Sequence, residues 1–423
     1  ACKRKPSSQA PSAGAADPTA IRNMMRMLYN RASTQQEIPR YLLLFGDGSY
    51  DNVSTKKGNT NLIPTFQSSN STSKTSSFVT DDYFGLLDIN EGEADGLIDI
   101  GIGRFPVSTQ EQANTIINKI NSYYNQTHSG DWQNQLCFIG DDEDGNVHMR
   151  DANILADYVR NNHPEFNVQK IFFDAYPQQS SPTGELYPDV NAAINNRVNN
   201  GALIINYTGH GNERWLAHEK VVMISDILSW RNINKLNVFV TATCEFSRFD
   251  DYNLISAGEW VLLSPKGGAV ALLSTTRLVY SSPNFVLNQN FIKTVFSQDT
   301  DNGEPFHRLG DVVRITKRLS GTGYNKRNFM LLGDPAIRLR YPEYTMSIDS
   351  INGKPLASAT DTIKALSQIT IKGKVVTSNA KDKVDFNGAG SITLFDKENT
   401  VTTLANNQGS TMSFLTRDNI IYK

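Results

Sequence analysis

The chain has few cysteines, a net charge close to zero and no long apolar run. Its 423 residues include 3 cysteines, an odd number that cannot all pair, and the formal net charge is −2. Such a balance gives no electrostatic reason to expect nucleic acid, whose binders normally carry a basic patch. No apolar stretch approaches the ~18 residues of a membrane-spanning helix. The nearest candidate, residues 260–276, is interrupted by Pro265 and Lys266. We therefore expect neither a nucleic-acid partner nor a membrane span.

The first residues lack the apolar segment of a secretory signal peptide. Residues 1–18 are rich in Ala, Ser and Pro and begin with a basic cluster. This composition predicts a flexible arm over residues 1–20, or the cut edge of a longer protein. The arm holds Cys2, whereas Cys137 lies in an apolar run typical of a buried thiol. Cys244 is therefore the cysteine whose setting suggests chemistry.

Two apolar runs, Ala202–Tyr207 and Leu236–Ala242, are typical of strands buried on both faces. They predict central strands of a mostly parallel sheet. Strand-like runs alternate with helical periods on either side of them, which predicts a doubly wound α/β fold. We expect one α/β subdomain over residues 21–130 and a second, catalytic one over residues 131–341. Short Thr/Ile/Val runs between turn residues predict an immunoglobulin-like β module, cut short, over residues 342–423.

A histidine and a cysteine follow the two central runs. His210 comes after the first run and Cys244 after the second. Functional groups of a parallel sheet gather beyond the carboxyl ends of its strands, so the two side chains are expected to meet there. A thiolate attacks acyl carbons readily, and an imidazole can serve as its base and as the acid for a leaving amine. The pair predicts a cysteine peptidase; the alternative is a core thiol and a capping imidazole.

Glycines flank the histidine on both sides. Gly209 and Gly211 allow the backbone to approach a substrate closely. The backbone N–H groups of Gly211 and Cys244 are predicted to form an oxyanion hole, which would stabilise the tetrahedral intermediate of acyl transfer.

The order of these parts resembles the gingipain family of caspase-like cysteine peptidases (C25), in which a His–Gly pair and a Cys close consecutive strands. The segments that carry the resemblance are Asp81–Gly85, Gly101–Phe105, Asn206–Gly211, Phe239–Cys244, Ala269–Thr276 and Leu331–Pro335. The similarity spans about residues 41–340. It implies a caspase-like, gingipain-type sheet in two subdomains.

Within that family the sequence is most similar to the C-terminal signal peptidases of the type IX secretion system, the PorU-type sortases. The likeness rests on Asp17–Arg22, Tyr41–Asp51 and Cys244–Asp250, and secreted gingipains differ in the last of these. It implies removal of a cargo's C-terminal signal domain and transfer of the new carboxyl end to a cell-surface acceptor. It also implies a location on the extracellular face of the bacterial outer membrane beside a β-barrel partner. A secreted endopeptidase and an inactive binding partner in outer-membrane assembly remain open.

The resemblance also implies a third carboxylate that orients the histidine, placed in the acidic turn at residues 140–146. Asp142 is the best match and Asp141 the next. Such a group fixes the imidazole tautomer and stabilises its charged form; the alternative is a solvated acidic turn. Asp142, Asp144 and Asn146 also have a spacing that can ligate calcium, although the turn is not an EF-hand loop. No cofactor is required, and a structural calcium ion is allowed.

Residues near the predicted nucleophile supply candidate walls for a substrate pocket. They are Glu245, Thr275, Thr276 and Tyr280. Glu245 either binds substrate or caps the following turn. His148 and His218 lie near the same loops, and His218, which has no glycine flanks, is expected at the rim.

Overall fold

The computed structural model describes residues 17–53, 56–70, 72–93, 95–182, 184–358, 367–377, 387, 392–406, 410–417 and 420–422. Most of the predicted arm, including Cys2, lies outside the described residues. The chain forms two compact units. The larger contains the residues through Leu339 together with Glu398–Thr416, and the smaller contains Arg340–Lys397 and Arg417–Lys423.

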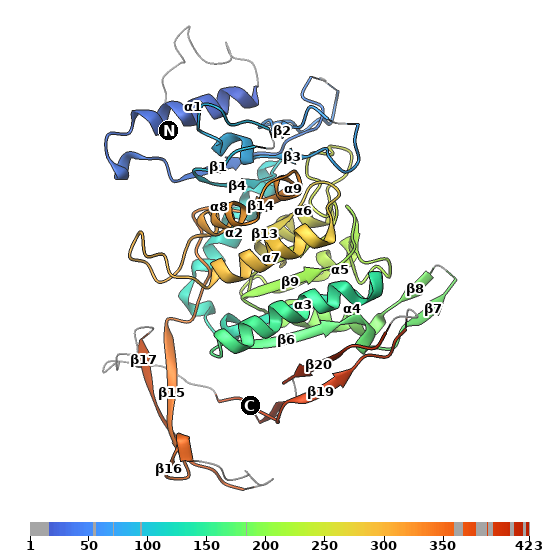
Figure 1. The fold of residues 1–423 in the computed structure, drawn as a ribbon, viewed down its shortest axis with the longest axis vertical. Coiled ribbons are helices and arrows are strands. Elements are labelled where there is room, and N and C mark those ends of the chain that lie inside the picture. The colour runs from blue at the N-terminus through green and yellow to red at the C-terminus, as the bar shows by residue number, and fades with distance from the viewer. Residues whose placement is uncertain are drawn as a thin grey trace. The chain divides into compact units, whose positions relative to one another are not determined.

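The larger unit is built on one eight-stranded sheet (Figure 1) with the order β1-β4-β14-β13-β12-β9-β5-β6. Neighbouring strands are parallel except β13 and β14. The strands are β1 (Tyr41–Phe45), β4 (Gly101–Phe105), β5 (Gln135–Gly140), β6 (Asn167–Phe172), β9 (Ile204–Thr208), β12 (Asn237–Ala242), β13 (Ala269–Thr275) and β14 (Phe329–Leu332). The predicted α/β fold is confirmed, and the two apolar runs are the adjacent strands β9 and β12.

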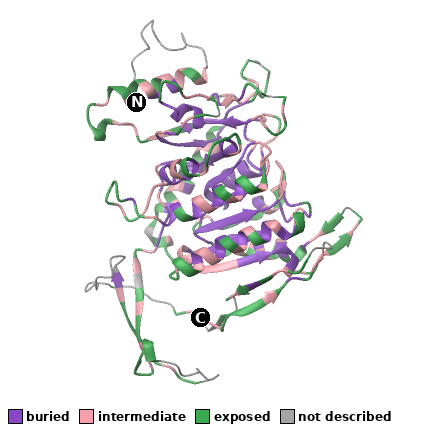
Figure 2. Ribbon diagram, viewed as in Figure 1, coloured by how far each residue is buried: buried purple, intermediate pink, exposed green. Residues whose placement is uncertain are grey.

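Helices cover both faces of the sheet. They are α1 (Pro18–Arg31), α2 (Gln110–Tyr124), α3 (Glu143–Asn162), α4 (Pro188–Asn200), α5 (Ile224–Ser229), α6 (Ala257–Leu263), α7 (Ser281–Val295), α8 (Leu309–Leu319) and α9 (Asn325–Asn328). Successive strand residues point to opposite faces. Ile205 and Tyr207 of β9 therefore share one core with residues of α2, α4, α5 and α6, while α3, α7 and α8 pack together on the other side. Figure 2 shows the central strands as the most buried part of the unit.

Three separate two-stranded sheets also belong to the larger unit. They are β2 (Phe66–Gln67) with β3 (Val79–Thr80), β7 (Gln179–Ser181) with β8 (Gly184–Leu186), and β10 (Trp215–Leu216) with β11 (Val222–Met223). The β10–β11 pair directly follows β9 in sequence, so it adjoins the segment that carries His210.

A hairpin from the C-terminal part of the chain belongs to the larger unit. Its strands are β19 (Asn399–Thr402) and β20 (Ser413–Thr416), and Phe414 lies edge-on against Phe172 of β6 with ring centroids 4.7 Å apart. The buried ammonium of Lys170 donates to the carbonyl of Leu415 at 2.8 Å. The hairpin thereby covers the edge strand β6.

The smaller unit consists of antiparallel strands. They are β15 (Tyr344–Ile351), β16 (Lys354–Pro355), β17 (Ile371–Thr377), β18 (Leu394–Phe395) and β21 (Ile420–Tyr422). These small sheets are compatible with the predicted immunoglobulin-like module. One of the turns predicted for this module, at residues 407–409, lies outside the described residues. In the described part of the chain, no helix is long and apolar enough to cross a membrane.

Candidate active site

His210 and Cys244 follow the ends of two adjacent parallel strands. β9 ends at Thr208 and β12 at Ala242, and these two residues are register partners. His210 and Cys244 therefore each follow, by two residues, the last register pair of these two strands. Gly211 packs against Thr243, because a Cβ on Gly211 would come within 2.6 Å of the Thr243 hydroxyl oxygen. The structure brings the two segments side by side, and the catalytic roles of His210 and Cys244 stay predictions.

Cys244 carries a largely buried thiol. Its Sγ accepts a hydrogen bond from the backbone N–H of Val279 at 3.5 Å and lies 3.6 Å from the carbonyl oxygen of the same residue. Burial raises the pKa of the Cys244 thiol above its ordinary value, the Val279 N–H opposes this, and the Glu245 carboxylate adds to it. The thiol is therefore protonated near neutral pH, and it needs a base to become a nucleophile.

Buried polar groups hold the backbone of His210. Its N–H donates to Asp141 Oδ2 at 2.8 Å, and its carbonyl accepts from the Tyr207 hydroxyl at 2.7 Å. Gly209 lets the chain pass directly over Asp141, since a Cβ there would lie 2.3 Å from the Cβ of Asp141. The glycine thus serves a close contact inside the protein, and Asp141 positions the main chain that carries the imidazole.

A left-handed turn brings a carboxylate to the His210 ring. Asp144, Gly145 and Asn146 have φ of 55°, 62° and 66° within the first turns of α3. Non-glycine residues in this region are strained and tend to mark functional sites. Asp144 Oδ2 lies 3.1 Å from His210 Nε2, and the buried amide of Asn146 donates to the carbonyl of Ser410 at 2.5 Å. The hairpin segment therefore anchors the turn that presents Asp144.

Asp142, the predicted orienting carboxylate, has other partners. Its Oδ2 accepts from the Tyr187 hydroxyl at 2.6 Å, and burial raises its pKa to about 6. Oxygen atoms of Asp141, Asp142 and Glu219 converge within 4.8 Å of one another, and burial raises the pKa of Glu219 to about 8. Asp144 belongs to a different cluster. If calcium binds, these three buried carboxylates offer it oxygen ligands; calcium itself stays a prediction.

Two further histidines surround His210. The ring of His218 stacks on it with centroids 4.8 Å apart, and its side chain is 66% exposed, which places it at the rim. His148 is buried and meets the His210 ring edge-on at 5.1 Å. Burial lowers the pKa of His148, so its imidazole is neutral at physiological pH. Asp144 precedes His148 by four residues, and the left-handed turn between them brings Asp144 Oδ2 to 3.3 Å from His148 Nε2, an approach that no helical spacing in the sequence indicates.

The predicted oxyanion donors are available. Gly211 and Leu216 lie opposite each other in an isolated antiparallel β-bridge. The hydrogen bonds of this bridge join the residues on either side of the pair, so the Gly211 N–H points away from Leu216. Within the described residues, neither the N–H of Gly211 nor that of Cys244 donates to a backbone carbonyl. Both can therefore bind a carbonyl oxygen, and their oxyanion role stays a prediction.

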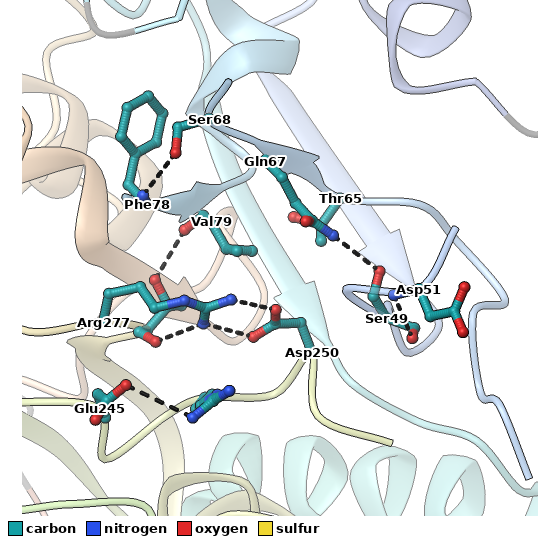
Figure 3. Close-up of polar contacts among 12 residues, drawn as sticks. Ser49, Asp51, Thr65, Gln67, Ser68, Phe78, Val79, Glu245, Asp250 and Arg277 are labelled. Carbon is teal, nitrogen blue, oxygen red and sulfur yellow. Dashed lines mark hydrogen bonds and ion pairs between the residues drawn. The ribbon is translucent and has the colours of Figure 1, made fainter. Parts of the chain in front are cut away.

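Arginines fix the residues after Cys244. Glu245 has a left-handed φ of 52°, and its carboxylate lies 3.7 Å from Arg248, which also pairs with Glu213 at 2.9 Å. Arg277 forms an ion pair with the buried carboxylate of Asp250 at 2.5 Å (Figure 3). The backbone N–H of Glu245 donates to the Arg277 carbonyl at 3.3 Å. Glu245 is thereby held beside the candidate nucleophile in a defined conformation.

The other predicted pocket residues occupy different environments. Thr275 and Thr276 are fully buried, and their hydroxyls donate to the carbonyls of Thr243 and Val79. These two side chains tie the end of β13 to the residue after β12 and to β3, and they present no surface to a substrate. Tyr280 is 57% exposed and lies beyond the end of β13, and its contact with a substrate stays a prediction.

The chain was compared with known proteins. It matches peptidase family C25 over residues 6–340. No curated protein sequence matches it. The solved structure of the Arg-specific cysteine proteinase gingipain R aligns with a TM-score of 0.57 and 17% identity, covering 94% of this chain and 88% of that one. The RgpB pro- and mature-domain complex of Porphyromonas gingivalis aligns with a TM-score of 0.56 and 16% identity, covering 94% and 89%.

Dimeric latent PorU from Porphyromonas gingivalis aligns with a TM-score of 0.43 and 22% identity, covering 94% of this chain and 33% of that one. The gingipain alignments show that the fold is that of the gingipains. Because the family match extends over most of the chain, the protein belongs to peptidase family C25, a family of cysteine peptidases.

Proposed function

We propose that this protein is a cysteine peptidase and transpeptidase that uses Cys244 and His210 to remove the C-terminal signal domain of secreted cargo. The observation that supports the dyad is the register of β9 and β12, which sets both residues two positions beyond paired strand ends. Membership of family C25 supports thiol chemistry. The sortase activity rests on the resemblance of Cys244–Asp250 to the type IX sortases.

The proposed reaction passes through a thioester. His210 takes the proton of the Cys244 thiol as Sγ attacks the peptide carbonyl, and the N–H groups of Gly211 and Cys244 stabilise the oxyanion. His210 then protonates the leaving amine, which is the new N-terminus of the signal domain. Cargo remains on Sγ until water or an acceptor amine attacks, and His210 receives the proton of that nucleophile.

The proposed setting follows from the substrate. Cargo with a C-terminal secretion signal reaches the cell surface, so the enzyme would act on the extracellular face of the outer membrane. An outer-membrane β-barrel protein would retain it there. Both the β-barrel anchor and the cell-surface acceptor are inferred from the resemblance of the sequence to the type IX sortases.

The proposal is tested by incubating the full chain with a cargo protein that carries its C-terminal signal domain, with and without hydroxylamine as a model acceptor. Mass spectrometry identifies the new terminus. We expect a hydroxamate at the cargo's new carboxyl end with hydroxylamine, a free carboxylate without it, and no cleavage by Cys244→Ala. Cys137→Ala, which changes a fully buried thiol, is the matched control and should cleave.

Two results would favour the rival functions. A free carboxylate under all conditions, even at high acceptor concentration, would support a secreted endopeptidase. Cargo binding without any cleavage by the wild type would support an inactive gingipain-fold partner in outer-membrane assembly.

A further inference from the structure

We infer that Asp144, His148 and His210 form a binding site for Zn²⁺, and that an ion bound there blocks the peptidase. The ligand atoms of the three side chains lie within 4.8 Å of one another. The site itself rests on geometry alone. Its inhibitory effect rests in addition on the function proposed above.

The distances at Asp144 fit tetrahedral coordination. Asp144 Oδ2 lies 3.1 Å from His210 Nε2 and 3.3 Å from His148 Nε2. Two ligands at the usual zinc–nitrogen and zinc–oxygen distances, about 2.1 Å, are about 3.4 Å apart at the tetrahedral angle. The carboxylate therefore already has, toward each ring, about the spacing that an ion would impose, and the three ligand atoms all lie within 4.8 Å of one another.

The buried nitrogen of His148 provides an independent indication of a ligand. The residue is 5% exposed, and its Nε2 makes no well-directed hydrogen bond, although Asp144 Oδ2 lies 3.3 Å away. A buried polar atom left without a partner costs about 1–3 kcal/mol. This nitrogen belongs to the same cluster of ligand atoms as Asp144 and His210, so a cation between the three residues would satisfy it.

The donor set favours zinc over calcium or magnesium. Two imidazole nitrogens and one carboxylate oxygen are typical zinc ligands, whereas calcium and magnesium prefer oxygen alone. The side chains of His210 and Asp144 are 33% and 58% exposed. An ion can therefore enter from solvent, and a fourth coordination position remains open to water.

Occupation of this site would disable the candidate base. A metal ion on His210 Nε2 displaces the Asp144 contact that orients the ring, and its positive charge opposes protonation of the imidazole. His210 would then no longer accept the Cys244 proton. Removal of the ion would restore the dyad, which makes the site a reversible inhibitory switch.

The test measures metal binding in a variant that lacks the reactive thiol. Full-chain Cys244→Ala, freed of metal with a chelator, is titrated with Zn²⁺ by calorimetry. We expect one ion per chain, with at least tenfold weaker binding after His148→Gln or Asp144→Asn is added. His218→Gln, which changes a ring stacked on His210 but outside the cluster, is the matched control and should bind unchanged.

A second readout identifies the ligands. Co²⁺ in place of Zn²⁺ should give the visible absorption of a tetrahedral nitrogen and oxygen site, lost in His148→Gln and kept in His218→Gln. The exposed Asp144→Asn variant guards against misfolding of the buried His148→Gln, because asparagine tolerates the left-handed turn. Absence of binding by Cys244→Ala, or equal affinity in all variants, would overturn the proposed site.

The activity arm separates this inference from the proposed function. With Cys244 intact, Zn²⁺ should suppress cargo cleavage and a chelator should restore it, and the inhibitory concentration should rise at least tenfold in His148→Gln. Zinc that binds without suppressing cleavage would refute the switch. If the protein binds Zn²⁺ but cleaves no cargo even with chelator present, the zinc site stands and the proposed peptidase function is refuted.

Discussion

Asp144 stands where a carboxylate can orient the His210 imidazole. Its Oδ2 is 3.1 Å from Nε2, while Asp141 holds the backbone N–H of the same histidine. Two carboxylates of the acidic turn thus have different roles: Asp141 positions the main chain of His210, and Asp144 contacts its ring. Asp142, between them in sequence, accepts a hydrogen bond from the Tyr187 hydroxyl.

Replacement of Asp144 should therefore impair turnover more than replacement of Asp142. We expect Asp144→Asn to lower kcat by roughly 10- to 100-fold, because a neutral amide stabilises the imidazolium less well. Asp142→Asn should cost less than tenfold. Steady-state cleavage assays with chelator present compare the two. A larger loss of kcat in Asp142→Asn would identify Asp142 as the orienting group instead.

Cys244 should depend on His210 for its reactivity. Because burial raises the thiol pKa, alkylation of Cys244 by iodoacetamide in His210→Ala should become fast only above the ordinary range of a free thiol, about 8.5. The wild type should react at lower pH. Peptide mapping after alkylation from about pH 5 to about pH 10 measures both profiles. Identical profiles would contradict the role of His210 as base.

At the scale of elements, the β19–β20 hairpin links the end of the chain to the candidate site. The buried carboxylate of Asp174 accepts from the N–H groups of Ala405 and Asn406 at 2.9 and 2.7 Å. Ser410, in the same hairpin, accepts from Asn146 of the left-handed turn. A contact that stabilises the hairpin therefore also stabilises the left-handed turn that holds Asp144 beside His210.

Loss of the Asp174 carboxylate should loosen this hairpin. Asp174→Ala leaves two backbone donors without their acceptor, at a cost of about 1–3 kcal/mol. Hydrogen exchange should accelerate at residues 404–406 and in the turn at residues 144–146. Arg160→Ala, which breaks an exposed pair with Glu398, is the control and should change exchange little. Unchanged exchange in Asp174→Ala would rule out the anchoring role.

Elements that are buried on both faces leave a local pattern in the sequence and are predictable from it. Strands β9 and β12 are buried on both faces, so their apolar runs predicted them and the neighbouring His210 and Cys244 segments. The left-handed conformation of Asp144 was not predictable, because Gly145 indicates a turn but not which side chain the turn presents. Asn146 and Ser410 are 264 positions apart, and no local pattern encodes such a contact.

At the scale of the whole molecule, buried carboxylates make stability depend on pH. Asp47 follows β1 and is 6% exposed, and burial raises its pKa to about 7 against the opposing Thr60 hydrogen bond and the Arg104 charge. The folded protein therefore holds this proton more tightly than the unfolded chain. The stability it contributes is complete below pH 3.8, its ordinary pKa, and is lost as pH rises through about 7.

Asp47→Asn should remove this dependence. At pH above about 7 the variant should be more stable than the wild type by up to roughly 4 kcal/mol, and near pH 4 the two should be alike. The Thr60 hydroxyl can turn to accept from the new amide. Thermal unfolding at several pH values measures the difference, with Asp301→Asn at an exposed position as control. A pH-independent difference would contradict the buried-charge explanation.

The most direct test of the peptidase assignment is intact-mass spectrometry of the full chain, quenched with acid during cargo cleavage. The dyad predicts cleavage of the cargo and a transient adduct that equals the cargo's acyl portion, mapped to Cys244 and absent from Cys244→Ala, which should not cleave. Cleavage by Cys244→Ala at the wild-type rate, or an acyl group mapped to another residue, would contradict it.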